Sequence, residues 1–243
     1  MIPKIIHYCW FGRNPLPNSA QRCIESWRKK MPDYEIKEWN EDNFNVNIIP
    51  FTCEAYSVKK YAYTSDYARL WIIYNYGGVY FDTDVEVIRP INDILMKGPF
   101  MAFEKHLNDP ENAIYVNPGL GFAAEKGNLV IKEIMAHYEA SHYILKDGTI
   151  QQIPIVPITT NVLKKHGLVR SEIPLKVEGG FTIYPWAYFC PIEYLSRNLE
   201  VTDNTRTIHH YTESWMNWKD KLKMRKGMFF SNGIGKWIKK LLG

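Results

Sequence analysis

Residues 77–84 read Gly77-Gly78-Val79-Tyr80-Phe81-Asp82-Thr83-Asp84 and carry the strongest structural signal in the chain. The apolar run 79–81 predicts a short buried strand, and the glycine pair before it predicts the end of a helix, where glycine readily adopts a left-handed conformation. Asp82 and Asp84 stand two residues apart, so an extended backbone would point both carboxylates the same way. Carboxylates beside a buried strand are costly unless a cation or hydrogen-bond donors meet them. The segment therefore predicts a polar ligand site at the end of a strand.

Outward from this segment, apolar periodicity predicts alternating strands and helices. On the N-terminal side we expect strands at 4–11 and 34–39 and helices at 19–30 and 53–76. On the C-terminal side we expect strands at 100–104, 119–124, 181–185 and 208–211 and helices at 129–141 and 160–166. Strand–helix–strand order at this spacing is typical of an α/β sandwich around a largely parallel sheet.

The composition is that of one globular domain with an unusual end. A chain of 243 residues with 46% hydrophobic and 23% charged residues has enough apolar material for a core. We place a single domain over residues 1–216 and a helical, basic and hydrophobic tail over residues 217–243. Cations mixed with bulky apolar side chains predict peripheral contact with an anionic membrane surface; a final helix packed on the core is the alternative. The net charge of +4 is modest, and no motif indicates nucleic-acid binding.

Cysteine usage and hydropathy indicate the compartment. Cys9, Cys23, Cys53 and Cys190 have no CxxC spacing, which predicts thiols in a reducing environment. We recognise no signal peptide and no window of about 18 uncharged apolar residues. The expected location is the cytoplasm, with the tail at the inner face of the cell membrane.

Two short patterns carry the candidate chemistry. Hard ions such as Mn²⁺ and Mg²⁺ prefer carboxylate oxygens, so Asp82 and Asp84 predict a divalent metal site; a surface turn with two solvated acids is the alternative. Upstream, Asp66 and Arg69 are three residues apart and share one face of the predicted helix. Taken alone, this pair is more typical of a surface ion pair than of a ligand site.

Three ordered motifs together resemble the DXD-containing glycosyltransferases of family 32. The motifs read Ile2-Pro3-Lys4-Ile5-Ile6-His7-x-x-Trp10-Phe11-Gly12, then Ser65-Asp66-x-x-Arg69 with Tyr74-x-x-Gly77-Gly78-x-Tyr80-x-Asp82-x-Asp84, and finally Ile208-His209-His210-Tyr211-x-x-Ser214-Trp215. The family is similar to yeast initiating α-1,6-mannosyltransferases, to bacterial capsule and O-antigen transferases and to the glucosyltransferase domains of clostridial toxins. The resemblance implies a GT-A fold, a nucleotide-sugar donor, Mn²⁺ or Mg²⁺, and retention of anomeric configuration.

The resemblance also implies roles for residues around the acidic segment. Asp84 matches the metal ligand, and Asp82 matches the residue that contacts the ribose and donor sugar and approaches the metal through water. Asp66 and Arg69 match the pair that holds donor sugar hydroxyls, with Arg69 also near the diphosphate. These roles agree with the chemistry, because a carboxylate accepts bonds from hydroxyls and a guanidinium donates to oxygens. Tyr80 matches a contact to the nucleotide.

Further residues are implied to complete the donor site. Trp10 matches an aromatic residue that stacks on the base, and Asn117 resembles a donor-side loop residue. Ser214 and Trp215 match residues that close over the β-phosphate and the metal, as a lid would. His209 and His210 are adjacent, so on a strand they point to opposite faces and only one readily faces the metal. The family pattern favours His210, although His209 stays open.

The expected activity is transfer of a hexose from a nucleotide-sugar to a saccharide acceptor. A UDP-sugar is favoured and GDP-mannose is open; a lipid-linked acceptor in surface polysaccharide biosynthesis fits the predicted membrane tail. A haloacid-dehalogenase-like phosphohydrolase is one alternative, because Asp82-Thr83-Asp84-Val85 follows an apolar strand, but no Asp-Asp dipeptide occurs for its second acidic motif. A non-catalytic sugar-binding protein is the other alternative, and the intact carboxylates argue against it.

Overall fold

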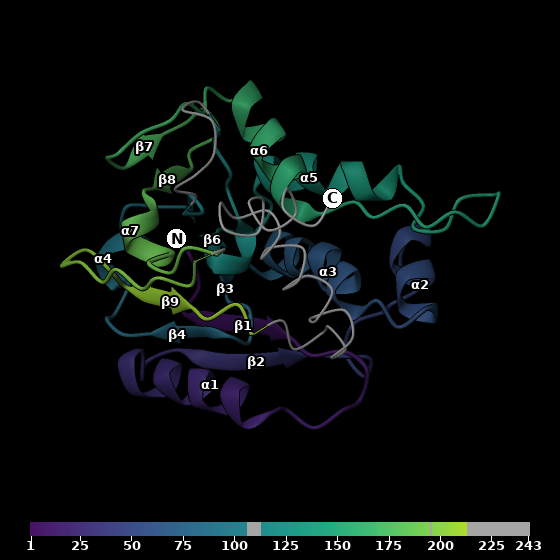
Figure 1. The fold of residues 1–243 in the computed structure, drawn as a ribbon, viewed down its shortest axis with the longest axis horizontal. Coiled ribbons are helices and arrows are strands. Elements are labelled where there is room, and N and C mark those ends of the chain that lie inside the picture. Colours follow the sequence, from purple (N-terminus) through teal and green to yellow (C-terminus); the bar gives the residue numbers. More distant parts are fainter. Residues whose placement is uncertain (106–112, 195, 213–243) are drawn as a thin grey trace, which may run out of the picture. The chain divides into compact units, whose positions relative to one another are not determined.

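A computed structural model describes residues 1–105, 113–194 and 196–212 of the chain (Figure 1). One compact unit spans Met1–His210, and the fold below is that of this unit. The predicted domain boundary at 216, the tail 217–243, and Ser214 and Trp215 lie outside the described residues. Within the described ranges, no helix is both long and apolar enough to cross a membrane.

A seven-stranded sheet forms the centre of the unit. Its order is β2 (Glu35–Trp39), β1 (Ile5–Cys9), β3 (Gly78–Tyr80), β6 (Phe122–Ala124), β5 (Phe100–Ala102), β8 (Thr182–Tyr184) and β7 (Leu175–Lys176). The pairs β1–β2, β1–β3 and β5–β8 are parallel, whereas β3–β6, β5–β6 and β7–β8 are antiparallel. The prediction of a largely parallel sheet is therefore wrong. Apolar periodicity gives the faces of a strand but not its direction, which depends on the path of the connecting chain.

A second, two-stranded sheet joins segments far apart in the sequence. Strand β4 (Val85–Val87) pairs antiparallel with β9 (Thr207–His209), with Val85 opposite His209. The hydrogen bond from the His210 amide to the Asp84 carbonyl, 2.9 Å long, extends this pairing by one step. The pairing brings the predicted C-terminal histidines beside the acidic segment.

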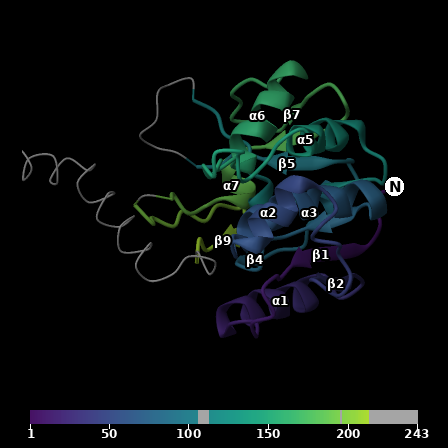
Figure 2. The same ribbon diagram turned by 90° about the vertical axis from the view of Figure 1, so that its right-hand side faces the viewer.

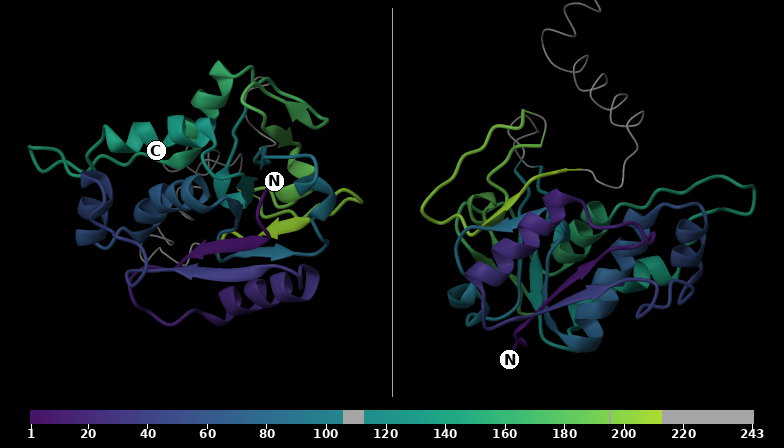
Figure 3. Two further views of the ribbon diagram at one scale, coloured as in Figure 1. Left: turned by 180° about the vertical axis from the view of Figure 1, so that it is seen from behind. Right: turned by 90° about the horizontal axis from the view of Figure 1, so that it is seen from below.

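Helices cover the central sheet from both sides (Figures 1 and 2). They are α1 (Asn18–Lys30), α2 (Pro50–Ser57), α3 (Tyr61–Tyr76), the short α4 (Asn92–Leu95), α5 (Leu129–Glu139), α6 (Ile155–Lys165) and the short α7 (Trp186–Phe189). On one face, Trp27 of α1 packs against the rings of Tyr8 and Phe81, with centroids 5.7 and 5.5 Å away. On the other face lie α3 and α5, as the views from behind and below also show (Figure 3). This arrangement confirms the α/β fold class implied by the GT-A resemblance.

Two predicted elements are divided in the structure. The helix expected over 53–76 is two helices, α2 and α3, because Lys59 between them has a left-handed backbone with φ of 59°. The strand expected over 119–124 begins only at Phe122, after a 3₁₀ turn at Pro118–Leu120. In both cases a local change of backbone conformation interrupts an apolar run that periodicity alone reads as continuous.

The junction between α3 and β3 follows from the glycine pair. Gly77 and Gly78 have φ of 66° and 108°, and a Cβ on Gly78 would lie 2.7 Å from the carbonyl oxygen of Ile5. The buried His7 ring accepts from Trp39 Nε1 at Nδ1 and donates from Nε2 to the Gly77 carbonyl, 2.9 Å away. Burial lowers the pKa of His7 to about 4, so the ring stays neutral at neutral pH. This junction places the residues after β3 at the edge of the sheet formed by the carboxyl ends of β1 and β3.

Candidate active site

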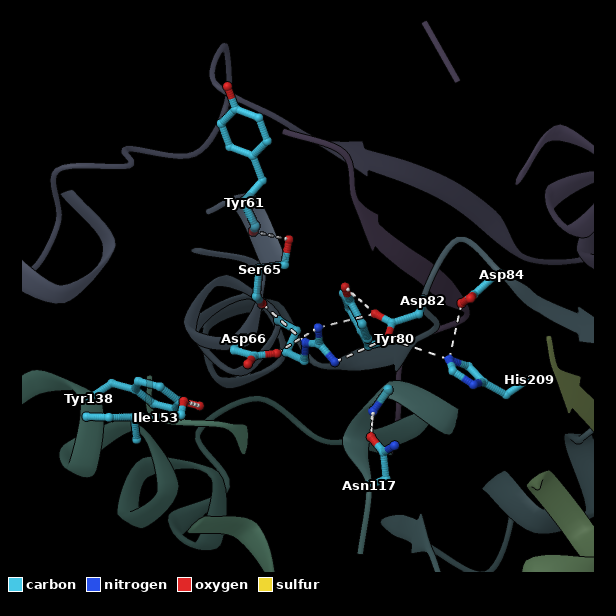
Figure 4. Close-up of polar contacts among 12 residues, drawn as sticks. Tyr61, Ser65, Asp66, Tyr80, Asp82, Asp84, Asn117, Tyr138, Ile153 and His209 are labelled. Atoms are coloured by element: carbon cyan, nitrogen blue, oxygen red, sulfur yellow. Dashed lines mark hydrogen bonds and ion pairs between the residues drawn. The ribbon is translucent and has the colours of Figure 1, made fainter. Parts of the chain in front are cut away.

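The two carboxylates of the acidic segment lie in the turn between β3 and β4. The Val85 amide donates to the Asp82 carbonyl over 3.0 Å, so the backbone turns here instead of continuing the strand. The carboxylates still meet at one place, because Nε2 of His209 lies 4.0 Å from Asp82 Oδ2 and 3.1 Å from Asp84 Oδ1. The turn, and not the alternation of an extended strand, therefore brings the two side chains together (Figure 4).

Arg69 stands between two carboxylates on the buried face of α3. Its Nη2 lies 3.0 Å from Asp66 Oδ1 and 3.3 Å from Asp82 Oδ1, and its guanidinium lies 5.0 Å from the centre of the Tyr80 ring. The side chains of Arg69 and Asp66 are only 6% and 13% exposed, so the surface ion pair considered above is excluded. The Tyr80 hydroxyl donates to Asp82 Oδ1 over 3.1 Å. These four residues form one connected network (Figure 4).

Burial sets the ionisation of this network. Burial raises the pKa of Asp66 to about 7, although the charge of Arg69 acts in the opposite direction. The pKa of Asp82 is also raised by burial, against the attraction of Arg69. Burial opposes the charge of Arg69, but the influences of Asp82, then Tyr80, then Asp66 outweigh burial and hold the pKa of the guanidinium above its usual value. The network thus contains one permanent cation, Arg69, and two acids whose ionised forms are favoured by its charge.

The structure brings His209, and not His210, to the acidic pair. His209 is buried at the end of β9, whereas His210 is exposed and its ring bonds Glu86 Oε2 at 2.9 Å. Our preference for His210 next to the carboxylates was wrong, because the β4–β9 register turns the adjacent side chain toward them. Burial lowers the pKa of His209, but the charge and hydrogen bond of Asp84 outweigh burial and raise it.

The donor set fits a divalent cation. Asp82, Asp84 and His209 each offer one ligand atom, and these atoms lie within 4.8 Å of one another. Two carboxylate oxygens and an imidazole nitrogen suit Mn²⁺ and leave coordination positions for phosphate oxygens and water. Among the residues that the structure describes, this is the group of acidic and histidine side chains close enough to hold an ion.

The turn just before β6 also reaches Asp82. The Asn117 side chain accepts a hydrogen bond of 2.7 Å from the Gly119 amide (Figure 4). A Cβ on Gly119 would lie 2.5 Å from Asp82 Oδ2 and 3.4 Å from Arg69 Nη1. Asn117 therefore holds a turn whose Gly119 closely approaches Asp82, which explains why this loop carries glycine; a contact of Asn117 with a donor stays a prediction.

Trp10 lies one residue beyond β1, at the carboxyl end where its parallel neighbour β3 also ends. Its amide donates to the Trp39 carbonyl over 2.8 Å, and its indole Nε1 donates to the Asn14 carbonyl over 2.6 Å. The ring is only partly buried. Trp10 thus shares the sheet edge with the acidic segment, which is where open α/β sheets bind ligands.

Sequence reasoning missed Glu104, which bonds Asn117. The Nδ2 atom of Asn117 donates to Glu104 Oε1 over 3.0 Å. It also missed the backbone of Ile155, at the start of α6, which is one of the influences that lower the pKa of Asp66 against burial. The signal for Glu104 was present, because an acid ended the strand predicted over 100–104; no comparable pattern marks Ile155.

Sequence comparison gives an independent view of the chain. A family model described as a glycosyltransferase sugar-binding region containing a DXD motif matches residues 17–101. The uncharacterized glycosyltransferase L373 of Acanthamoeba polyphaga mimivirus is 32% identical, and the match covers 96% of this chain and 89% of the relative. Inositol phosphoceramide mannosyltransferase 1 of Schizosaccharomyces pombe is 29% identical over 111 residues, which are 41% of this chain and 33% of that protein. The chain thus matches about a third of the length of that mannosyltransferase.

Two solved glycosyltransferase structures can be superposed on the backbone of this chain. One is involved in glycosylation of the major capsid of PBCV-1; it is 12% identical, with a TM-score of 0.49, and the match covers 93% of this chain and 99% of that one. The other is the galactosyltransferase LgtC, solved with donor and acceptor sugar analogues, at 14% identity and a TM-score of 0.48, covering 94% of this chain and 96% of that one.

Proposed function

The chain belongs to the glycosyltransferases with a DXD sugar-binding region, and on that premise we propose that it transfers a hexose from a nucleotide-sugar to a saccharide acceptor with a divalent metal ion. The observation that carries the proposal is the joining of Asp66, Arg69 and Asp82 to the Asp84–His209 pair at one edge of the sheet. The first part supplies groups that bind sugar hydroxyls, and the second supplies ligands for a cation.

The metal we propose is Mn²⁺ or Mg²⁺. Asp84 and His209 would ligate it. Asp82 would contact it directly or through a water molecule. A cation there offsets negative charge on the leaving diphosphate as the sugar–phosphate bond breaks.

The buried network would orient the donor sugar. Arg69 is fixed by two carboxylates and by the Ser65 carbonyl 3.2 Å from its Nε, so its guanidinium is already in place before a ligand arrives. Asp66 accepts from sugar hydroxyls, and Arg69 donates to hydroxyl or phosphate oxygens. Such preorganisation lowers the entropic cost of holding the donor for reaction. Trp10 and Tyr80 are proposed to face the nucleotide, with Ser214 and Trp215 closing the site.

The donor and acceptor are proposed by class. A UDP-hexose follows from the family pattern, and the names of two relatives as mannosyltransferases support GDP-mannose as a second donor to test. The inositol phosphoceramide in those names is a lipid-borne acceptor, which supports a lipid-linked saccharide here. We propose retention of anomeric configuration, which NMR of the product would test.

A thermal-shift panel tests the donor class most directly. UDP-glucose, UDP-galactose and GDP-mannose are each added with and without Mn²⁺, and binding raises the unfolding temperature by mass action. We expect one nucleotide class to stabilise the chain only when Mn²⁺ is present. Equal shifts with and without the ion, or none with any donor, would contradict the proposal. A separate assay would incubate the chain with the same nucleotide-sugars. Release of phosphate from them without sugar transfer would favour the phosphohydrolase alternative.

Membrane contact through residues 217–243 is a separate proposal. Its support is the mixture of lysines and bulky apolar residues in this stretch of sequence. Co-sedimentation with anionic liposomes compares the full chain with one truncated after Trp218. Equal partitioning of both would contradict the proposal.

A further inference from the structure

Glu104 is a fourth acidic residue near the site, after Asp66, Asp82 and Asp84, and it lies two residues beyond the end of β5. Its amide donates to the Tyr115 carbonyl over 2.8 Å, and its carboxylate accepts from Asn117 Nδ2 over 3.0 Å. The side chain is half-buried. Glu104 therefore joins the chain that follows β5 to the turn that begins at Asn117.

The contacts of Asn117 allow one orientation of its amide. A backbone N–H only donates, so the Gly119 amide requires the Asn117 oxygen on its side. A carboxylate only accepts, so Glu104 requires the Asn117 NH₂ group on the other side. Rotating the amide by 180° would break both bonds. Glu104 and the Gly119 amide together determine how Asn117 is held.

The turn that Asn117 holds touches the reaction site. Leu120 and Gly121 donate from their amides to the carbonyls of Asn117 and Pro118, each over 3.2 Å, which closes the 3₁₀ turn. Gly119 then approaches Asp82 so closely that an added Cβ would lie 2.5 Å from its Oδ2 atom. Any movement of this turn therefore changes the space beside Asp82.

The backbone around Glu104 is firmly anchored. The next side chain, Lys105, is 2% exposed; its Nζ lies 2.8 Å from Glu200 Oε2 and 3.8 Å from the centre of the Trp186 ring. The Lys105 amide meets Cys190 Sγ at 3.4 Å. With its neighbour held on α7 and its own amide paired, Glu104 presents its carboxylate to Asn117 at low entropic cost.

We propose that Glu104 is a positioning residue of the glycosyl-transfer site, which acts through Asn117 to hold the Pro118–Leu120 turn against Asp82. The importance of this role for catalysis rests on the proposed function, but the holding of the turn does not. Glu104 thereby governs the shape of the wall beside the donor sugar without itself touching the metal.

A matched pair elsewhere in the chain provides the control. Asn128 Nδ2 donates to Glu125 Oε1, also over 3.0 Å, and Asn128 Oδ1 accepts from the amides of Val130 and Ile131 at the start of α5. This Asn–Glu pair has the same chemistry, but it lies beside the last turn of α3, where the Gly127 amide bonds the Tyr74 carbonyl. Glu125→Ala removes an equivalent hydrogen bond without touching the proposed site.

Hydrogen exchange measures the turn independently of any reaction. We compare Glu104→Ala, Glu104→Gln and Glu125→Ala with the wild-type chain, following a peptide that covers 117–121. Losing a bond to a charged group is expected to speed exchange in Glu104→Ala by about tenfold. Glu104→Gln keeps an acceptor oxygen and is expected to stay within about threefold of wild type. Glu125→Ala is expected to leave this peptide unchanged. Unchanged exchange in Glu104→Ala would overturn the proposal, as would equal acceleration in Glu125→Ala.

A double-mutant cycle tests whether the turn matters for transfer. With the nucleotide-sugar that the wild-type chain uses, Glu104→Ala is expected to lower kcat/KM by about tenfold. In an Asn117→Ala background the same substitution is expected to cost less than about twofold, because its route of action is already lost. Equal losses in both backgrounds would overturn action through Asn117. If the wild-type chain transfers no sugar, the proposed function is refuted. If Glu104→Ala still speeds exchange in residues 117–121, the role of Glu104 in holding the turn stands independently of that outcome.

Discussion

The site has two halves, Asp66–Arg69–Asp82 and Asp84–His209, and they differ in what balances the negative charge of their carboxylates. In the first half, Asp66 and Asp82 surround Arg69, a permanent cation supplied by the chain and held on a long, buried helix. In the second half, Asp84 faces His209, whose charge depends on a proton. The first half thus contains its own cation before any ligand binds, whereas the second half would gain one only from the metal ion proposed above. Each prediction below separates these two halves.

Arg69→Met is expected to have the largest effect, because it leaves two buried carboxylates without their cation. We expect the free energy of unfolding to fall by about 3–5 kcal/mol. Sugar transfer is expected to fall by more than about 1000-fold, because the group that orients the donor is lost. Urea denaturation and initial-rate kinetics measure the two effects.

Glu25 and Arg28 on α1 provide the matched control for Arg69→Met. They have the same three-residue spacing as Asp66 and Arg69 and lie 3.2 Å apart, but their side chains are 70% and 58% exposed. Solvent screens such a pair, so Arg28→Met is expected to leave both stability and transfer unchanged. Similar destabilisation by the two substitutions would show that burial does not give Arg69 its importance.

Asp84→Ala is expected to abolish transfer while the fold survives. Removing this carboxylate takes a ligand from the cation and a like charge away from Asp82, so activity and stability separate. We expect kcat/KM to fall by at least about 1000-fold, to the detection limit, with little change in the unfolding midpoint. Transfer at the wild-type rate would contradict metal binding in this half of the site.

His209→Gln and His210→Gln compare two neighbouring side chains, of which the first contacts Asp84 and the second contacts Glu86. The first is expected to raise the Mn²⁺ concentration for half-maximal activity by about 10- to 100-fold, because a ligand is lost. The second is expected to change it by less than about threefold, since His210 bonds Glu86 instead. A manganese titration of both variants decides the matter, and the reverse order would assign the metal to His210.

Gly119→Ala tests the boundary between the halves and is expected to have the smallest effect. Asp82 is held by Arg69 and Tyr80, so its carboxylate has little freedom to move away from a new methyl group. We expect kcat/KM to fall by about tenfold, mainly through a higher KM for the donor. The measurement is a donor titration at saturating Mn²⁺, and unchanged kinetics would show that the exact position of Asp82 is unimportant.

Much of the first half could be predicted from local sequence patterns. Asp66 and Arg69 share a face because they stand three apart on a helix, and Gly77 and Gly78 end that helix because they tolerate positive φ. The acidic pair follows a buried strand, as the apolar run before it indicated. These features depend on backbone periodicity over a few residues, so a single sequence contains them.

The second half depends on contacts between distant segments. His209 reaches Asp84 through strand pairing across more than 120 residues, and adjacent histidines differ in role because of the register of that pairing. The direction of β6, the closeness of Gly119 to Asp82 and the bond between Glu104 and Asn117 likewise arise only when the chain is folded. Periodicity specifies which face a side chain takes, but the partner across that face is chosen by packing of the whole domain, which no local pattern encodes.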